Sequence, residues 1–280
     1  MLKFTKMHGI GNDYIYINAI EQKIDNPNAL AIKLSDRHFS IGGDGVILIC
    51  SSDVADAKMR MFNADGSEGM MCGNGVRCVG KYVYDNLLDD KSRDTITIET
   101  LSGIKTLKIT AVDGKAELLE VDMGKAELTA SLIPVVADSE EVISKPLMVN
   151  DTEHIITCVS MGNPHCVTFV DDVDSLDLEK IGPHFENHEA FPQRINTEFV
   201  KVIDENTLQM RVWERGSGET WACGTGACAT VVAACENGYC KKGEDVTVHL
   251  RGGDLIINYT DERVLMTGPA TKVFDGEIEV

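Results

Sequence analysis

Two short segments of this chain place a cysteine directly before a glycine-x-glycine turn. Residues 72–75 read Cys-Gly-Asn-Gly, and residues 223–226 read Cys-Gly-Thr-Gly. An apolar stretch with helical spacing follows each turn, so each cysteine is expected at the N-terminus of a helix. Unpaired backbone N–H groups and the helix dipole favour a thiolate over a thiol at such a position. Two cysteines in matching settings therefore suggest an acid and a base that work on one substrate.

The chain carries a second regularity at the spacing of the cysteines, which is 223 − 72 = 151 positions. Three further correspondences occur at this spacing without an insertion: Gly11-Asn12 with Gly162-Asn163, Phe62-Asn63 with Trp213-Glu214, and Glu68 with Glu219. One match among small residues could be coincidence, but four in register indicate a diverged internal duplication. We expect two related halves that contribute one cysteine each to a central cleft.

Two opposed thiols suit the inversion of a carbon that carries a hydrogen, an amino group and a carboxylate. A thiolate removes the hydrogen from one face, and a thiol supplies another at the opposite face. Backbone N–H groups at the helix starts could hold the carboxylate while it takes up negative charge. Glycine is expected in these turns to allow close approach and a positive φ. The motifs of serine hydrolases, P-loop nucleotidases and zinc peptidases are absent. No lysine has a distinctive setting, although spacing alone does not exclude a pyridoxal-type lysine.

The apolar pattern predicts an α+β fold that is rich in strands. Helices are expected after each cysteine turn, from residue 75 and from residue 226 to a C-cap at Gly238, and also over residues 28–35 and 175–184. We expect two pseudo-twofold-related domains, each a curved β-sheet wrapped round a central helix. The N-terminal half would comprise residues 1–117 and 265–280, and the C-terminal half residues 118–264. Strands are predicted at residues 14–17, 46–49, 59–62, 95–98, 155–159, 166–170, 208–212, 246–250, 255–257, 264–266 and 272–274.

Composition limits the classes of protein. The 280 residues are 43% hydrophobic and 25% charged, which is typical of a globular protein. The net charge of −19 argues against a nucleic-acid partner, because phosphate binding needs a basic surface. No segment resembles a membrane span or a signal peptide, so no membrane partner and a cytoplasmic location are expected.

The chain has nine cysteines, and their pattern favours neither a disulfide framework nor a metal site. Their number is odd, and the chain lacks an export signal. The closest pairs are five or six residues apart, which is too long for a zinc knuckle, and no metal site is predicted. Apart from Cys72 and Cys223, the cysteines are expected to be small buried hydrophobic residues.

Several segments together resemble the diaminopimelate epimerase family. The first cysteine region reads FNADGSE at 62–68 and MCGNGVRC at 71–78, and the second reads ERGSGET at 214–220 and ACGTGA at 222–227. KMHGIGND at 6–13 and SMGNPH at 160–165 match further family segments. The resemblance runs from residue 3 to the C-terminal strands. It implies an epimerase without cofactor that interconverts LL- and meso-diaminopimelate in lysine and peptidoglycan precursor biosynthesis, commonly as a homodimer.

The resemblance also implies roles for particular residues. Cys72 and Cys223 would be the acid–base pair, and His165 and Glu214 would tune the thiols. Backbone N–H groups of Gly73, Asn74, Gly224 and Thr225 would bind the reacting carboxylate. The distal ammonium and carboxylate of the substrate would be bound by Asn12, Asn63, Asn163, Asn196, Glu214 and Arg215.

Two alternatives remain open from the sequence. One is a related two-thiol racemase or epimerase of another amino acid, similar to proline racemase. That family typically has histidine where Asn74 stands and lacks the Glu-Arg-Gly-x-Gly-Glu segment. The other is a non-catalytic thiol or metal-binding protein.

Overall fold

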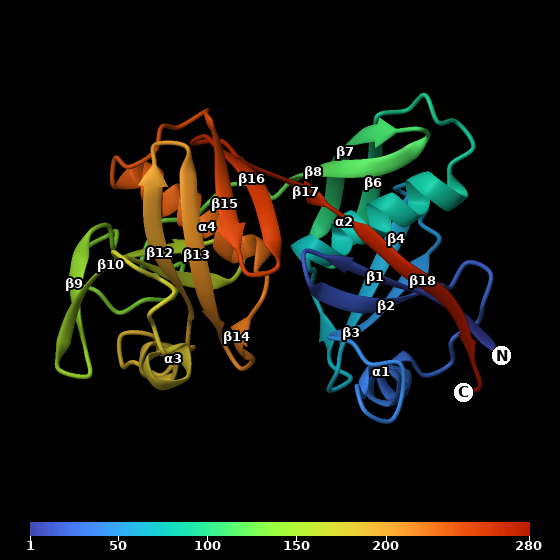
Figure 1. The fold of residues 1–280 in the computed structure, drawn as a ribbon, viewed down its shortest axis with the longest axis horizontal. Coiled ribbons are helices and arrows are strands. Elements are labelled where there is room, and N and C mark those ends of the chain that lie inside the picture. The colour runs from blue at the N-terminus through green and yellow to red at the C-terminus, as the bar shows by residue number, and fades with distance from the viewer. The chain divides into compact units, whose positions relative to one another are not determined.

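The computed structural model describes all residues 1–280, and these divide into two compact units. Unit 1 comprises residues 1–122 and 267–280, and unit 2 comprises residues 123–266. The chain starts in unit 1, forms unit 2 and returns to unit 1 for its last strand, as the blue and red ends of the ribbon in Figure 1 show.

Unit 1 is a mixed sheet with two α-helices and a short π-helix, η1. The strand order is β18-β1-β2-β3-β4-β6-β7-β8, with parallel pairing only between β2 and β3 and between β4 and β6. The elements are β1 (Leu2–Gly9), β2 (Asn12–Asn18), α1 (Pro27–Ser35), β3 (Gly45–Cys50), β4 (Ala57–Asn63), β5 (Glu68–Gly69), α2 (Gly73–Tyr82), η1 (Val83–Leu87), β6 (Thr95–Thr100), β7 (Gly103–Val112), β8 (Lys115–Asp122) and β18 (Thr271–Ile278).

Unit 2 has the same plan. Its strand order is β9-β10-β11-β12-β13-β15-β16, with parallel pairing between β11 and β12 and between β13 and β15. The elements are β9 (Lys145–Val149), β10 (Thr152–Ser160), β11 (Pro164–Phe169), α3 (Leu178–Glu186), β12 (Asn196–Asp204), β13 (Thr207–Glu214), β14 (Gly218–Thr220), α4 (Gly224–Glu236), β15 (Asp245–Leu250) and β16 (Gly253–Tyr259). The strand β17 (Val264–Pro269) follows.

The elements recur at the spacing found in the sequence. Helix α1 spans residues 27–35 and α3 spans 178–186, and both bounds differ by 151 (178 − 27 and 186 − 35). Helices α2 and α4 begin at Gly73 and Gly224, which are also 151 apart (224 − 73). The duplication therefore extends from the motifs to the elements that carry them.

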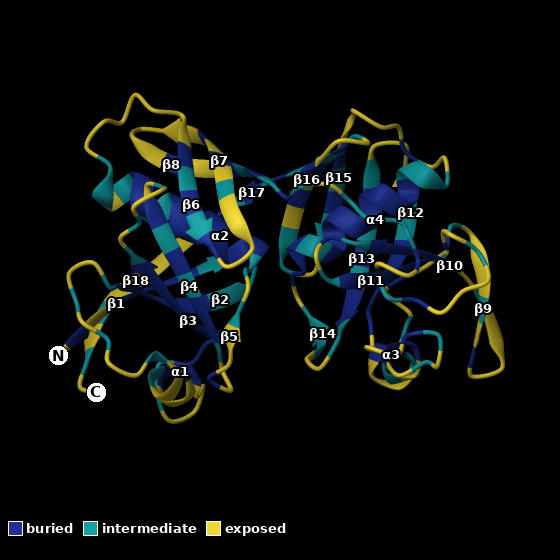
Figure 2. Cartoon of the chain, turned by 180° about the vertical axis from the view of Figure 1, so that it is seen from behind, coloured by how far each residue is buried: buried dark blue, intermediate teal, exposed yellow.

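In each unit the helix that follows the cysteine lies in the concave side of the sheet. Helix α4 contacts the strands from β10 to β13 as well as β15 and β16, and α2 contacts β1, β2, β6 and β8. Figure 2 shows both helices mostly in the colour of buried residues. Helices α1 and α3 pack instead on β3 with β4 and on β12 with β13. The expected class, α+β with a sheet wrapped round a central helix, is confirmed.

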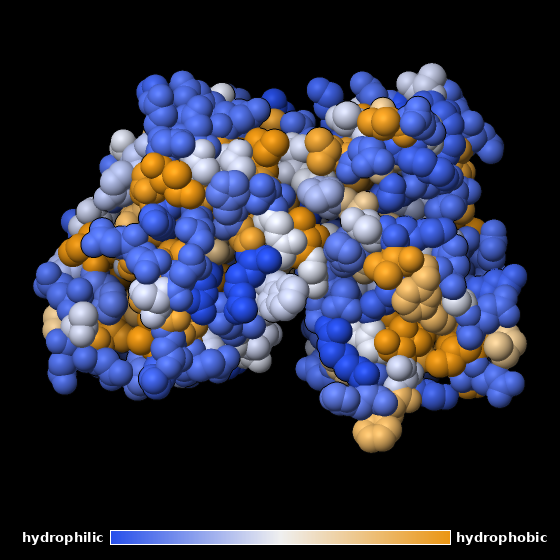
Figure 3. Space-filling view, in the orientation of Figure 1, coloured by the Kyte–Doolittle hydropathy of each residue, from blue (hydrophilic) through white to orange (hydrophobic).

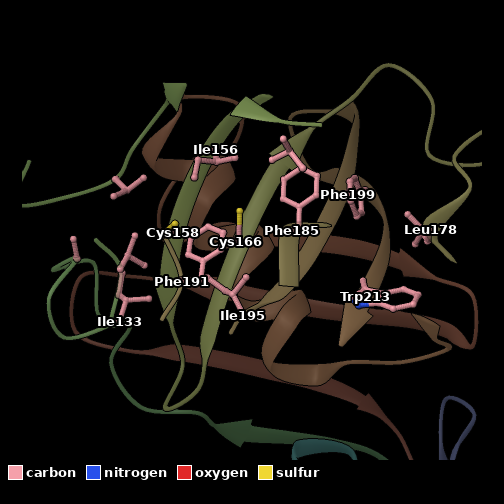
Figure 4. Packing of buried hydrophobic residues seen from close by; sticks show 14 residues of the cluster. Ile133, Ile156, Cys158, Cys166, Leu178, Phe185, Phe191, Ile195, Phe199 and Trp213 are labelled. Carbon is pink, nitrogen blue, oxygen red and sulfur yellow. The ribbon is translucent and has the colours of Figure 1, made fainter. Parts of the chain in front are cut away.

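Strand β12 shows how alternation separates two environments in unit 2. Phe199 lies in an apolar cluster with Phe185, with 5.3 Å between the two ring centroids. Cys158 and Cys166 belong to this cluster as ordinary apolar side chains, as Figure 4 shows. The preceding residue, Glu198, points to the opposite face of the strand, as the period of two requires, and lies under the first turn of α4.

The sequence predicted most elements, but not all. The strands expected in both halves are present, and the helices expected at 28–35 and 175–184 appear as α1 and α3. Four long strands were not predicted: β1, β7, β8 and β12. Most side chains of β7 are exposed, so this strand lacks the apolar run that would have identified it. No helix is long and apolar enough to span a membrane. Hydrophilic side chains cover most of the face shown in Figure 3.

Candidate functional site

Cys72 and Cys223 occupy the same structural position in their units, the N-cap of α2 and of α4. Both have extended backbones, with φ and ψ of −127° and 120° for Cys72 and −122° and 105° for Cys223. The side chain therefore turns back over the first helical turn. The N–H of Gly75 donates to Cys72 Sγ at 3.3 Å, and the N–H of Gly226 donates to Cys223 Sγ at 3.3 Å. Each sulfur thus takes the place of a capping oxygen at the positive end of a helix.

The second glycine of each turn is needed for space. A Cβ on Gly75 would lie 2.8 Å from Ile47 Cδ1, and one on Gly226 would lie 2.6 Å from Glu198 Oε1 and 3.1 Å from Cys223 Sγ. The expected positive φ is wrong, because none of the glycines in these two turns is among the positive-φ residues. Close packing under the sulfur is therefore the physical reason for glycine here.

In unit 1, an amide group contacts the sulfur. Cys72 Sγ lies 3.2 Å from Asn12 Oδ1, to which its S–H donates. The Nδ2 of Asn12 donates to Asp44 Oδ2 at 2.7 Å. An ionised carboxylate only accepts hydrogen bonds, so Asp44 fixes the amide with its oxygen toward the sulfur.

Asp44 is itself held in a network of charges. Its carboxylate accepts from the N–H of Asp13 at 3.0 Å and from Arg37 Nη2 at 2.8 Å. Arg37 also bonds Asp13, which forms an ion pair with Lys6. Hydrogen bonds from Arg37 and Lys6 outweigh burial and hold the pKa of Asp13 below its usual value. This network holds the Asn12 amide in one orientation.

In unit 2, a longer series of contacts approaches the sulfur. His165 Nδ1 lies 2.7 Å from Glu198 Oε1, and His165 Nε2 lies 3.1 Å from Asn163 Oδ1. Asn163 Nδ2 donates to Thr225 Oγ1 at 3.2 Å, and that oxygen lies 3.6 Å from Cys223 Sγ. The predicted residues Asn163, His165, Thr225 and Cys223 are therefore brought together through side-chain contacts.

The surroundings of Cys223 give its thiol a different pKa from that of a reactive thiol at the surface. Burial, followed by the carboxylates of Glu214 and Glu198, raises the pKa of Cys223 well above its usual value, against opposing hydrogen bonds from Thr225 and Gly226. Ionisation of this thiol therefore depends on hydrogen-bond donors that offset desolvation.

Five of the other seven cysteines are buried as expected, whereas Cys50 and Cys235 are only partly buried. All nine are free thiols. Burial raises the pKa of Cys78 to about 11, that of Cys240 to about 11 and that of Cys235 to about 12. No group of three or more His, Cys, Asp or Glu side chains is arranged to hold a metal ion.

The remaining predicted residues bond within their own units. Asn63 Nδ2 donates to Ser67 Oγ at 3.0 Å, and buried Asn74 accepts from Arg77 Nη2 at 3.0 Å. The amide of Asn196 bridges two segments: its nitrogen donates to Pro164 O at 2.8 Å, and its oxygen accepts from the Arg215 N–H at 2.9 Å.

The two predicted charged residues lie where β13 ends: Glu214 is its last residue, and Arg215 begins the loop that follows. Thr220 Oγ1 donates to Glu214 Oε1, and Arg215 Nη1 donates to Gln193 O at 2.9 Å. Arg215 is only partly buried, so its guanidinium is a charged group near the surface of unit 2. The structure places Asn196 behind this loop, where it holds the backbone of Arg215.

Sequence reasoning missed Asp44 and Glu198. Asp44 stands between Gly43 and Gly45, where an acidic residue resembles an ordinary turn residue. Glu198 follows Asn196 and Thr197 in the sequence, so it resembles part of a polar segment, and only the structure shows that it is buried.

Comparison with known proteins gives a consistent result. The family described as diaminopimelate epimerase matches residues 4–129 and 157–273. A diaminopimelate epimerase of Methanococcus maripaludis strain S2 is 58% identical over the full length of both chains. That of Acetivibrio thermocellus is 56% identical, covering 100% of this chain and 99% of the relative. That of Bacillus cereus ATCC 14579 is 51% identical, covering 99% and 96%.

Solved structures share the fold at low identity. A PhzF-family phenazine biosynthesis protein of Bacillus anthracis superposes with a TM-score of 0.69 at 18% identity, covering 100% of this chain and 99% of that one. A probable proline racemase of Agrobacterium radiobacter K84 gives 0.70 at 12% identity, covering 100% and 93%. These likenesses establish the fold alone.

Proposed function

From the premise that the chain belongs to the diaminopimelate epimerase family and is an isomerase, we propose that it converts LL- to meso-diaminopimelate by a two-base proton transfer between Cys72 and Cys223. The observation that carries the proposal is the matched position of the two sulfurs, each an N-cap of a buried helix with one backbone N–H donated to it at 3.3 Å. The residue that is a thiolate removes the α-hydrogen, and the other, as a thiol, supplies hydrogen to the opposite face. The roles exchange with the direction of the reaction.

The chain needs no cofactor in this proposal, because helix N-termini supply the electrostatic stabilisation. Backbone N–H groups of Gly73, Asn74, Gly224 and Thr225 would bind the reacting carboxylate as negative charge develops. The planar guanidinium of Arg215 suits the distal carboxylate. The distal ammonium group would be bound by Asn12, Asn63, Asn163, Asn196 and Glu214.

His165 and Glu214 would tune the Cys223 thiol in different ways. The Glu214 carboxylate raises the pKa of Cys223, second only to burial, and so favours the thiol form. His165 acts through Asn163 and Thr225, whose oxygen lies 3.6 Å from the sulfur. The two residues therefore bias the same sulfur from different strands, β13 and β11.

Reaction in deuterated water tests the two-base proposal. We expect early product to carry solvent deuterium at the inverted carbon, while recovered LL-diaminopimelate keeps its α-protium. The reason is that the hydrogen delivered at the opposite face comes from a thiol that has exchanged with solvent. Mass spectrometry of both stereoisomers at low conversion measures this.

The same assay separates the alternatives. Product that retains the α-protium would show that one base returns the same hydrogen, which contradicts the proposal. Proline, tested in parallel, should undergo no α-exchange, because it lacks the distal ammonium and carboxylate. Comparable exchange of proline would instead favour a racemase of the proline type.

Asp44 provides a test of how Cys72 is positioned. Asp44→Ala should lower the kcat for diaminopimelate by about tenfold to a hundredfold, because small misplacements of a catalytic contact have effects of this size. The free Asn12 amide could then turn its nitrogen toward the sulfur. Steady-state epimerisation measures the effect. Asp90→Ala is the control, since that exposed carboxylate bonds only Ser92 in its own turn; equal kcat values for both variants would contradict this role.

Three wider features are also proposed. The product would serve lysine and peptidoglycan precursor biosynthesis, the enzyme would act in the cytoplasm, and it would be a homodimer. Support for all three comes from the family resemblance. Light scattering of the purified chain tests the homodimer, and cell fractionation tests the location; a monomer or a membrane-bound pool would contradict them.

A further inference from the structure

Glu198 is a fully buried carboxylate that faces one ionisable partner. Its side chain and that of His165 are both 0% exposed, and the distance from Oε1 to Nδ1 is 2.7 Å. The second oxygen, Oε2, is buried without a hydrogen-bond partner. Burying a carboxylate without a partner costs free energy, and the contact with His165 is the interaction that can offset this cost.

The hydrogen bonds between His165 and the Cys223 sulfur can all donate in one direction. In the orientation of Asn163 in this structure, Oδ1 faces Nε2 of the ring and Nδ2 faces Thr225. Since Oδ1 can only accept, Nε2 must carry a proton, and Asn163 then donates to Thr225. The Thr225 hydroxyl is left to donate to Cys223 Sγ. Every donor points toward the sulfur, which stabilises a thiolate.

The opposite direction is the other self-consistent state. If Nε2 carries no proton, the amide turns round and donates to it, Thr225 donates to the amide, and the Cys223 S–H donates to Thr225. That arrangement stabilises the thiol. The proton on Nε2 therefore decides which form of Cys223 the chain of hydrogen bonds supports.

A carboxylate is what allows the ring to hold that proton. With Nε2 protonated, Nδ1 and Glu198 Oε1 share one further proton, so the pair as a whole is neutral. An imidazolium without a counter-charge would be strongly disfavoured at 0% exposure, whereas the pair with Glu198 can accommodate it.

The internal duplication shows that this arrangement belongs to one half only. Positions 165 and 198 correspond to Tyr14 and Ile47 in unit 1 (165 − 151 = 14; 198 − 151 = 47). Gly75 accordingly packs on Ile47, whereas Gly226 packs on the Glu198 carboxylate. The two N-caps are alike, but the groups beneath them differ.

We propose that Glu198 is a positioning residue for the proposed reaction. It holds the second proton on His165 and thereby directs the hydrogen bonds of Asn163 and Thr225 toward the Cys223 sulfur. This direction of the hydrogen bonds allows the thiol to ionise. The inference rests on the proposed function for its role in turnover, but its structural content concerns Cys223 alone.

The groups around Cys223 make opposing contributions. Glu214 on β13 and Glu198 on β12 raise the pKa of Cys223 through space, beyond the effect of burial. The N–H of Gly226 and the hydroxyl of Thr225, both on α4, lower the pKa. His165 on β11 acts through the hydrogen-bond chain. If Glu198 acts only through space, removing its charge should lower the pKa of Cys223. If it acts through His165, removing its charge should raise that pKa.

Alkylation of each cysteine, followed by peptide mass spectrometry without substrate, distinguishes the two. We expect Glu198→Gln to slow the reaction of Cys223 with iodoacetamide by about tenfold at neutral pH, equivalent to a pKa increase of about one unit. Cys72 in the same molecules should react at an unchanged rate. Faster or unchanged labelling of Cys223 would overturn the proposal.

Two further measurements do not depend on that variant folding. Thr225→Val, which removes the terminal hydroxyl, should slow Cys223 labelling, and Thr225→Ser should restore it. Nitrogen NMR of the wild-type protein should show that Nε2 of His165 carries a proton, as the orientation of Asn163 requires. An Nε2 without a proton, or fast labelling of Thr225→Val, would contradict the proposal.

Glu236→Gln is the matched control. This carboxylate lies at the far end of α4 and bonds Tyr259 and Lys242, so its removal should leave the labelling of Cys223 unchanged. Because no diaminopimelate is present, failure of these tests would refute the role of Glu198 and leave the two-base reaction to be judged by the deuterium assay.

Discussion

Cys72→Ala and Cys223→Ala are each expected to reduce diaminopimelate epimerisation by about a thousandfold or more, since acid–base catalysis by one positioned group contributes about 10²–10⁴-fold. Two-base inversion fails when either sulfur is absent, because one face of the carbon then has no group to remove or supply hydrogen. Chiral chromatography of the product over time measures the loss in both directions of the reaction.

Two other cysteines are matched controls for these variants. Cys78 and Cys228 lie in the same helices, α2 and α4, and are fully buried. Alanine at either position removes a thiol of similar size without touching an N-cap, so turnover should remain close to that of the wild type. Normal turnover by Cys72→Ala or Cys223→Ala, with a circular dichroism spectrum like that of the wild type, would refute the two-base assignment.

The sequence could predict these two positions because their signal is local. A cysteine before a Gly-x-Gly turn determines the N-cap contact by itself, and the spacing of 151 relates the two turns. The same spacing relates the bounds of α1 and α3, although these helices share little apolar pattern. A duplication is thus detected most reliably from a few well-defined motifs.

Side chains that act through a neighbour are harder to predict. Asp44 contacts Asn12, which is 32 positions away, and Glu198 contacts His165, which is 33 positions away. Their function depends on parallel pairing of β2 with β3 and of β11 with β12, and the sequence does not specify such pairing. Strand β12 itself was not predicted, because it begins with Asn196, Thr197 and Glu198. The polar residues that make this strand hard to predict from the sequence are those that belong to the candidate site.

The buried pair of His165 and Glu198 should also contribute to the stability of unit 2. His165→Leu is expected to lower the free energy of unfolding by about 3–5 kcal/mol, because it leaves the Glu198 carboxylate buried without its partner. Glu198→Leu should cost less, about 1–3 kcal/mol, since the remaining imidazole can lose its charge and keeps its bond to Asn163. The double variant replaces both polar groups with apolar ones and should be more stable than His165→Leu alone.

Urea unfolding followed by tryptophan fluorescence measures this cycle in the relevant unit. Both tryptophans of the chain, Trp213 and Trp221, lie in unit 2, so the signal reports on that unit. Coupling requires that the loss in the double variant be smaller than the sum of the single losses, as for any pair in direct contact. Strictly additive losses would mean that Glu198 and His165 stabilise the fold independently. The short contact between them would then not be the reason that a carboxylate lies beneath the Cys223 helix.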